Sequence, residues 1–302
     1  MKLLVTGASG QLGNELRRCL ESGLAEIGPI PSAYQGAQVD YVDREKLDIA
    51  DSRSVHQWFG QSAPYDLVIN CAAYTDVDGC EKAEAHAYRV NALGPENLGR
   101  EVAATGGKLI HVSTDYVFSG TEAAPRTETD PVCPVSAYGR TKWAGEVLVR
   151  AACSKCFVVR TAWLYGYVGK NFAKTMMRLA GSEAKIAVVA DQFGNPTHAN
   201  DLAYEILKIG LTENYGVYHC TNEGTCSWFD FASAVVDLAG IPCEKEPISS
   251  VEYKRRFPLS AQRPHYSSLE NKHLAATIGN EMRPWRKALE TYVERWKARQ
   301  GS

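Results

Sequence analysis

The sequence predicts an α/β protein with a doubly wound parallel sheet, and two observations on its first half lead to this fold. Short runs of apolar and β-branched residues alternate with longer stretches of helical pattern. The short runs are nearly continuous in apolar residues, which is typical of strands that are buried on both faces. A strand–helix alternation at this spacing favours a parallel sheet with helices on both sides, and right-handed crossovers then favour the doubly wound arrangement.

The elements follow in order along the chain. In the first half, strands are expected at 3–6, 39–42, 67–71, 109–113 and 157–160, with helices at 11–22, 52–60, 83–105 and 137–152. After residue 160 the alternation loosens, and we expect helices at 171–180, 199–211, 227–239 and 285–297, with strands at 186–190 and 217–220. We therefore predict a first domain over 1–165, which also takes in 194–212, and a smaller interleaved lobe from the remaining segments of 166–302.

The composition is that of a globular chain with a sizeable core. The 302 residues are 45% hydrophobic and 23% charged, and 33 basic against 35 acidic residues give a net charge of −2. This balance offers no electrostatic footprint for nucleic acid or an anionic membrane, so neither is expected as a partner. No apolar run approaches the ~18 residues of a membrane helix, and no signal peptide is recognised, so we expect a cytoplasmic protein. Its nine cysteines are expected to be reduced thiols.

A glycine-rich segment follows the first expected strand and opens the first expected helix. Gly7, Gly10 and Gly13 permit a tight turn, close approach of the backbone to a phosphate, and close helix–strand packing. Amides at the N-terminus of the helix then face the anion. The alternative is a glycine-rich turn without a chemical role, but the position of the segment favours a nucleotide site, and so a Rossmann-type domain.

Charged residues after the second expected strand bear on the choice of nucleotide. Asp43 would chelate the ribose hydroxyls of NAD, whereas Arg44 beside it would meet the 2′-phosphate of NADP. The two residues favour opposite cofactors, so both NADH and NADPH remain open. Asp48 and Ile49, in the next loop, are candidate neighbours of the adenine. A solvated charged turn is the alternative for all four residues.

A tyrosine and a lysine four residues apart carry the candidate chemistry. Tyr138 and Lys142 fall on one face of an expected helix. A nearby ammonium stabilises a phenolate and would move the pKa of Tyr138 towards neutrality. The preceding strand ends in Ser113 and Thr114, which place hydroxyls at the carboxyl edge of the sheet, where ligands of such folds bind. The phosphate loop, the strand-end hydroxyls and the tyrosine–lysine pair together predict an oxidoreductase site.

In these features the chain resembles the extended short-chain dehydrogenase/reductase superfamily, whose catalytic triad matches Thr114, Tyr138 and Lys142. Within it, the blocks STDYVF at 113–118, RTAWLY at 160–165, NFAKTM at 171–176 and DQFGNPT at 191–197 are similar to the dTDP-4-dehydrorhamnose reductase family. Arg263 and Pro264 also match, and the likeness covers essentially the whole chain.

The resemblance implies a role for each matching residue. Gly10, Gln11 and Leu12 would contact the cofactor pyrophosphate, and Asp48 and Ile49 would flank the adenine. Ala73, Tyr74 and Thr75 would line the cofactor groove, and Val112 would lie behind the nicotinamide. Thr114 and Asp115 would touch the sugar, Trp163 would cover it, and Asn171 and Arg263 would face the substrate diphosphate.

The implied reaction is reduction by NADPH or NADH of the C4 ketone of dTDP-4-dehydro-β-L-rhamnose to dTDP-β-L-rhamnose, a precursor of cell-surface polysaccharides. The residues alone indicate only a nucleotide-linked 4-keto-sugar, so a reductase of another 4-keto-6-deoxysugar is the first alternative. Relatives include metal-linked dimers, so a homodimer with Mg²⁺ at its interface is a further expectation, although no metal ligand is identified in the sequence.

Two other functions on the same scaffold are weighed. Related dehydratases carry a glutamate base where this chain has Tyr116, which argues against dehydration. A non-catalytic regulatory subunit is also known within the resemblance group, but the intact Thr114, Tyr138 and Lys142 favour an enzyme.

Overall fold

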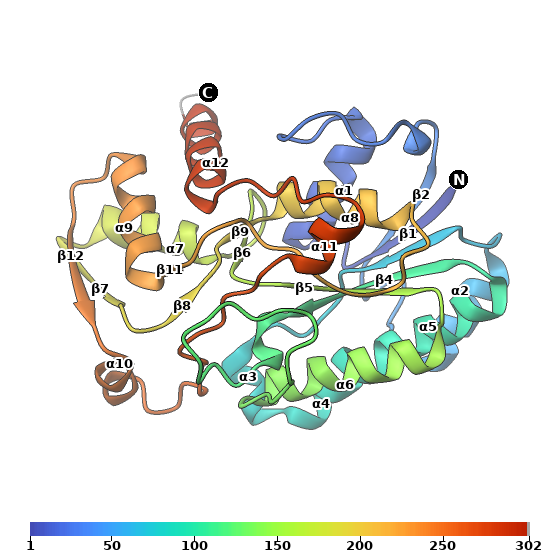
Figure 1. The fold of residues 1–302 in the computed structure, drawn as a ribbon, viewed down its shortest axis with the longest axis horizontal. Helices are drawn as coiled ribbons and strands as arrows, with labels where there is room; N and C mark the ends of the chain where they lie inside the picture. The colour runs from blue at the N-terminus through green and yellow to red at the C-terminus, as the bar shows by residue number, and fades with distance from the viewer. Residues whose placement is uncertain (301–302) are drawn as a thin grey trace.

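The main element of the structure, a computed structural model that describes residues 1–300, is a six-stranded sheet (Figure 1). Its order is β10–β5–β4–β3–β1–β2, and every pair of neighbours is parallel. The strands are β1 (Lys2–Thr6), β2 (Gln38–Val42), β3 (Leu67–Asn70), β4 (Lys108–Thr114), β5 (Cys156–Thr161) and β10 (Gly216–His219). All carboxyl ends therefore lie along one edge, and the strand order reverses between β1 and β3. The predicted fold class, a doubly wound parallel sheet, is confirmed.

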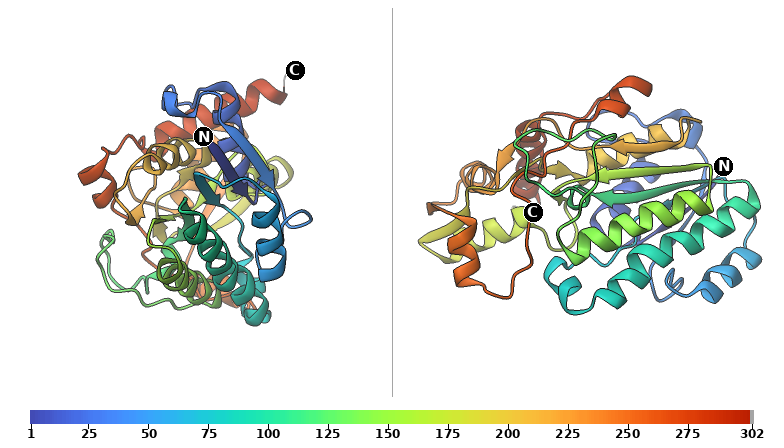
Figure 2. Two further views of the ribbon diagram at one scale, coloured as in Figure 1. Left: turned by 90° about the vertical axis from the view of Figure 1, so that its right-hand side faces the viewer. Right: turned by 60° about the horizontal axis from the view of Figure 1, so that its bottom comes forward.

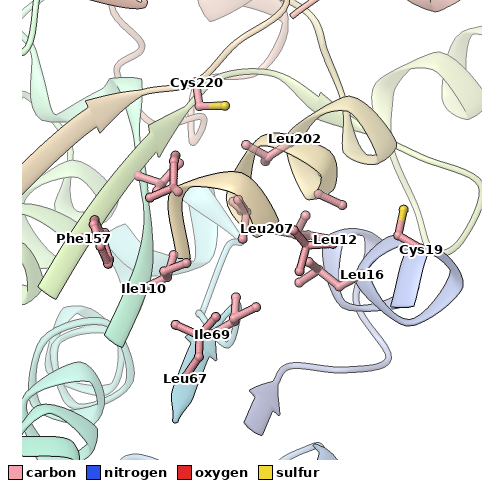
Figure 3. Packing of buried hydrophobic residues seen from close by; sticks show 14 of the residues in the cluster. Leu12, Leu16, Cys19, Leu67, Ile69, Ile110, Phe157, Leu202, Leu207 and Cys220 are labelled. Atoms are coloured by element: carbon pink, nitrogen blue, oxygen red, sulfur yellow. The ribbon is translucent and has the colours of Figure 1, made fainter. Parts of the chain in front are cut away.

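Helices cover both faces of this sheet, as Figures 1 and 2 show. One face carries α1 (Gln11–Ser22), α8 (Ala199–Gly210) and α11 (Lys272–Thr277), and the other carries α2 (Ser52–Gln61), α5 (Gly94–Thr105) and α6 (Ala137–Ala152). The side chains of β1, which alternate between the two faces of the sheet, explain why both faces are covered. Leu3 and Val5 join the core beneath α1 and α8, whereas Leu4 joins the core beneath α2 and α5. Figure 3 shows part of the first core, in which Leu12 and Leu16 of α1 lie close to Leu202 and Leu207 of α8. Because successive side chains point to opposite faces, a central strand must be apolar throughout.

A second set of elements packs around its own core beyond the carboxyl edge of the sheet (Figure 1). It contains α7 (Phe172–Ser182), α9 (Trp228–Ala239), α10 (Ser250–Arg256) and α12 (Trp285–Gln300), with β7 (Lys185–Val189) paired to β12 (Glu244–Ile248). Two-residue strands form two further pairs, β6 (Leu164–Tyr165) with β9 (Thr197–His198) and β8 (Phe193–Gly194) with β11 (Cys226–Ser227). The predicted division into 1–165 plus 194–212 and a second lobe stays a prediction. The main sheet also includes β10, which that division assigns to the second lobe.

The single helix expected at 83–105 is instead broken into several pieces. The structure has α3 (Val77–Lys82), α4 (Glu84–Tyr88), a π-helical turn at Arg89–Leu93 and then α5. Pro95, at the start of α5, has no N–H to donate to the carbonyl four residues earlier, so the regular ladder is interrupted there. Asn91 within the turn bonds the backbone of Tyr74 through both ends of its amide, at 2.8 and 3.1 Å. The break thus anchors the loop that follows β3.

Short 3₁₀ turns occur at Ser32–Tyr34 and Asp115–Val117. The nine cysteines are free thiols. In residues 1–300, none of the helices combines the length and the apolar character needed to span a bilayer.

Candidate active site

A cleft of about 720 Å³ lies at the carboxyl edge of the sheet and contains the point where the strand order reverses. Ligands of open α/β sheets bind at such a point. The cleft is lined by all of the residues that the sequence analysis singled out for the site, except Arg263. These are Gly7, Gly10, Gln11, Leu12, Gly13, Asp43, Arg44, Asp48, Ile49, Ala73, Tyr74, Thr75, Val112, Thr114, Asp115, Tyr138, Lys142, Trp163 and Asn171.

The three glycines of the loop between β1 and α1 are required by close backbone contacts. Gly7 has a φ of 64°, and a Cβ there would lie 2.8 Å from the amide nitrogen of Ala72. A Cβ on Gly13 would lie 2.5 Å from the carbonyl oxygen of Gly7, and one on Gly10 would lie 3.1 Å from the same atom. The loop therefore folds back tightly on itself and leaves the amides at the start of α1 open to the cleft, as anion binding requires.

Asp43 and Arg44 lie at the same end of the cleft but in different environments. The carboxylate of Asp43 accepts hydrogen bonds from the amide of Ser9, at 3.1 and 3.2 Å, and so holds the phosphate loop. The side chain of Arg44 is 74% exposed, and its only ion pair in residues 1–300 is with Asp48 at 3.5 Å. Arg44 is therefore free to meet an anionic group that enters this end of the cleft.

Tyr138 and Lys142 lie in the first turns of α6, and Thr114 is the last residue of β4. Helix α6 begins at this point because the hydroxyl of Ser136 accepts a hydrogen bond from the amide of Gly139 at 3.1 Å. Lys142 is buried, and its ammonium donates to the carbonyl oxygen of Val112 at 2.7 Å. The ring of Tyr138 packs edge-to-face against Tyr116, at 5.7 Å between centroids.

The protonation of this pair differs from the sequence-based expectation. Burial raises the pKa of Tyr138, and a hydrogen bond with Thr114 lowers it by a smaller amount. Burial also lowers the pKa of Lys142 to about 8. The direction is opposite to the expected effect of Lys142, because burial is the largest influence on the pKa of Tyr138. The phenol is therefore held in its protonated form, in which it can donate.

Asp115 brings a second titratable group to the cleft. It is 2% exposed, and the hydroxyl of Thr114 donates to its Oδ1 at 2.9 Å. Burial raises its pKa to about 7. Its Oδ2 is buried without a hydrogen-bond partner, which leaves an unsatisfied acceptor beside the cleft.

A buried ion pair lies directly beneath these groups and joins α6 to the sheet. Arg160 on β5 donates to both carboxylate oxygens of Glu146 on α6, at distances from 2.7 to 3.2 Å. The hydroxyl of Ser113 on β4 donates to the same carboxylate at 2.5 Å. The pair fixes the helix that carries Tyr138 and Lys142 against the ends of the strands.

The far wall of the cleft is aromatic. Trp163 has a φ of 47°, unusual for a bulky residue, and its indole stacks on Trp228 with an angle of 6° between the rings. Gly194 makes room for it, because a Cβ there would lie 2.5 Å from the indole. The sequence suggested Trp163 as a cover for the sugar, but its support by Trp228 comes from a distant segment that no local pattern could reveal.

The two residues expected at the substrate diphosphate lie apart. The amide of Asn171 donates to Gln11 of the phosphate loop at 3.1 Å, so it lies beside the cofactor end of the cleft. Arg263 is outside the lining and pairs with Asp78 at 3.2 Å. Sequence reasoning missed Lys170 and His86, which also line the cleft. Lys170 directly precedes Asn171, which was the only local signal, and His86 lies within the segment expected to be a helix.

One cluster in residues 1–300 has the composition of a metal site, but its charges are already balanced. The ligand atoms of Glu26, His198 and Asp201 lie within 4.8 Å of one another. Glu26 pairs with three arginines, Arg18, Arg283 and Arg295, at 3.0 to 3.3 Å, and Arg283 also pairs with Asp201 at 2.6 Å. A cation here would displace these pairs, so the residues do not fit a metal.

The parallel sheet, the glycine loop at its switch point and the Thr114–Tyr138–Lys142 group in one cleft define an extended short-chain dehydrogenase/reductase. Within this class the chain belongs to the RmlD substrate binding domain family, whose family model matches residues 1–298.

Three similar proteins illustrate the family. The chain is 41% identical over 297 residues to a dTDP-4-dehydrorhamnose reductase of Mycobacterium tuberculosis, covering 96% of this chain and 91% of the relative. It is 38% identical over 293 residues to the spore coat polysaccharide biosynthesis protein SpsK of Bacillus subtilis, covering 97% of each. Among solved structures, a dTDP-4-dehydrorhamnose reductase of Bacillus anthracis in complex with NADP superposes with a TM-score of 0.88 at 37% identity, covering 97% of this chain and 99% of that one.

Proposed function

We propose that this protein reduces the C4 ketone of dTDP-4-dehydro-β-L-rhamnose to dTDP-β-L-rhamnose, with NADPH or NADH as the hydride donor. The observation that carries the proposal is the presence of Thr114, Tyr138 and Lys142 in the same cleft as the glycine loop. With the pyrophosphate of the cofactor on that loop, its nicotinamide and a ketone beside Tyr138 would lie in the same cleft. The names of the relatives supply the identity of the nucleotide and the sugar.

The residues of the cleft fit a dinucleotide. The backbone cradle at Gly7, Gly10 and Gly13, which side chains would fill, suits a pyrophosphate, and Gln11 and Leu12 begin the helix behind it. Asp48 and Ile49 would flank the adenine, Ala73, Tyr74 and Thr75 would line the groove, and Val112 would lie behind the nicotinamide. When bound, the cofactor supplies the hydride.

Tyr138 is the proposed proton donor. Hydride addition to a ketone leaves negative charge on its oxygen, which a positioned acid neutralises in the transition state. The raised pKa of Tyr138 keeps its phenol protonated for this donation. The hydroxyl of Thr114 would bond the same oxygen, and Lys142 would hold the ribose hydroxyls near Tyr138. Asp115 would accept a sugar hydroxyl at its unpartnered Oδ2.

Both cofactors are proposed to be usable. Asp43 is engaged with the loop amide of Ser9, so its charge is partly offset by that hydrogen bond. Arg44 is exposed at the same end and would attract a 2′-phosphate. We infer rates with NADPH and NADH of similar order.

The second lobe is proposed to supply the substrate nucleotide site. It faces the carboxyl edge of the sheet and carries Trp228, which supports Trp163 as the cover of the sugar. Asn171 and Arg263 are proposed to act on the diphosphate, and Arg263 would have to leave Asp78 to do so. This is the functional basis for the proposed division into 1–165 plus 194–212 and the remaining segments. We place the reaction in the cytoplasm; the homodimer and the interfacial Mg²⁺ stay predictions.

The test is to supply the keto-sugar with NADPH, follow absorbance and identify the product by NMR. dTDP-β-L-rhamnose is the expected product. A product with the opposite configuration at C4 would make the protein a reductase of a different deoxysugar. Absence of NADPH oxidation in folded, cofactor-binding protein would favour a regulatory subunit.

A further inference from the structure

A second cavity lies between α7 and α12 and shares no lining residue with the catalytic cleft. Its volume is about 420 Å³, within the ~300–1,000 Å³ of small-molecule pockets. It is lined by Tyr167, Lys174, Met177, Arg178, Trp296 and Arg299, and we call it the α7–α12 pocket. Lys174 belongs to the NFAKTM block, in which the proposed reaction gives a role only to Asn171.

The pocket contains three cations without counter-ions. In the described part of the chain, no carboxylate lies within ion-pair distance of Lys174, which is half-buried, or of Arg178 and Arg299, which are exposed. The pKa of Lys174 is lowered by partial burial and by repulsion from the charge of Arg299. An anion in the pocket would remove this repulsion and gain three charge-assisted contacts.

Lys174 is already fixed in place for such a contact. Its ammonium donates to the carbonyl oxygens of Tyr167, at 2.6 Å, and Gly169, at 3.1 Å. These are neutral acceptors, so the side chain is ordered while its charge stays uncompensated. A ligand that binds here therefore pays little of the entropy cost of ordering this lysine.

The pocket has two aromatic side chains, Tyr167 and Trp296, and they differ in whether another ring is stacked on them. The ring of Tyr167 stacks on Tyr292 at 4.9 Å and also lies beneath the guanidinium of Arg299 at 4.3 Å. The indole of Trp296 is partly exposed, and within residues 1–300 no ring is stacked on it. A flat ring could therefore stack on Trp296 while its anionic group meets the cations.

We propose that the α7–α12 pocket is a second ligand site, which binds a nucleotide through its base on Trp296 and its phosphates on Lys174, Arg178 and Arg299. The combination of a stacking surface and clustered cations is how proteins bind single nucleotides without reading their sequence. The inference concerns a site separate from the catalytic cleft and does not depend on the proposed reaction.

The test counts bound dTDP per chain by equilibrium dialysis. We expect two molecules per wild-type chain, one in the cleft and one in the pocket, and one in the double variant Arg178→Ala/Arg299→Ala. If the proposed reaction is wrong and the cleft does not bind dTDP, the counts become one and zero, so the difference of one still supports the pocket. Equal counts in wild type and variant would overturn it.

Two controls separate charge, fold and stacking. Arg53→Ala/Arg286→Ala removes two exposed arginines outside the pocket, one of them on α12, and should bind dTDP as wild type does. Trp296→Leu should weaken the second dTDP at least ~10-fold, within the range for lost base stacking, and leave inorganic pyrophosphate binding unchanged. Equal affinity of the wild-type pocket for pyrophosphate and dTDP would overturn the assignment to a nucleotide. Matching unfolding midpoints show that each variant is folded.

Discussion

Replacing Glu146 by Gln would remove the negative half of the ion pair beneath the cleft. The side chains of Arg160 and Glu146 are 2% and 0% exposed, and three hydrogen bonds join the guanidinium to the carboxylate. The amide of Gln would still accept a hydrogen bond but would leave the guanidinium charge buried and unpaired. His219, a polar group near Arg160, cannot compensate, because a histidine supplies no negative charge; burial and that same arginine lower its pKa to about 3, so its ring stays neutral.

Loss of one partner from a buried pair costs about 3–5 kcal/mol, so we expect Glu146→Gln to lower the free energy of unfolding by this amount. Urea unfolding followed by tryptophan fluorescence measures it. The matched control is Glu252→Gln, which breaks an exposed pair with Arg255 and Arg256 and should have no measurable effect.

A second variant tests the cause of the loss. Glu146→Leu/Arg160→Met removes both charges and should recover part of the stability, because no buried charge is left unpaired. If Glu146→Gln unfolds at the same urea concentration as the control, the pair does not hold α6 to the sheet and the reasoning is refuted.

Three further predictions concern the cleft. Tyr138→Phe removes only the hydroxyl, so turnover should fall ~10²-fold or more while cofactor affinity, measured by fluorescence titration, barely changes; near-normal turnover would exclude Tyr138 as the acid. Arg44→Ala should lower kcat/KM for NADPH relative to NADH, because the exposed guanidinium is the cation nearest the expected 2′-phosphate; an unchanged ratio would exclude that contact. Asp115 binds its proton up to a pH of about 7 in the folded state and only up to about 4 when unfolded, so its burial costs stability as the pH rises through this window. Asp115→Asn should therefore gain stability relative to wild type between these pH values in urea melts, and parallel curves would contradict the raised pKa.

The central sheet and its helices were predictable because their signals are local. The helices expected at 11–22 and 137–152 match α1 and α6 at both ends. Each begins after a residue suited to the position, Gly10 of the phosphate loop and the capping Ser136. By contrast, α10 has no buried residue and so leaves no hydrophobic period in the sequence.

The candidate site was predictable as far as chain order fixed it. In a parallel sheet, residues that follow strands meet at one edge, so the glycine loop, Thr114 and Trp163 had to converge there. The neighbours of each side chain were not predictable, because they come from segments far apart in sequence. The pairing of Arg263 with Asp78, 185 residues away, is an example. The bond between Lys142 and the Val112 carbonyl, 30 residues away, is another.

The polar groups beneath the cleft and those that line it differ in how fully they are hydrogen-bonded. Beneath the cleft, the carboxylate of Glu146 is bonded by Arg160 and Ser113, so that α6 is tied to β5 and β4. Two residues that line the cleft, Asp115 and Thr161, each have a buried side-chain oxygen without a hydrogen-bond partner, Oδ2 and Oγ1 respectively. A buried polar atom without a partner costs about 1–3 kcal/mol, which a sugar hydroxyl could return on binding. Asp115 and Thr161 therefore leave two unsatisfied oxygens beside the cleft, whereas the carboxylate of Glu146 beneath them is already bonded by Arg160 and Ser113.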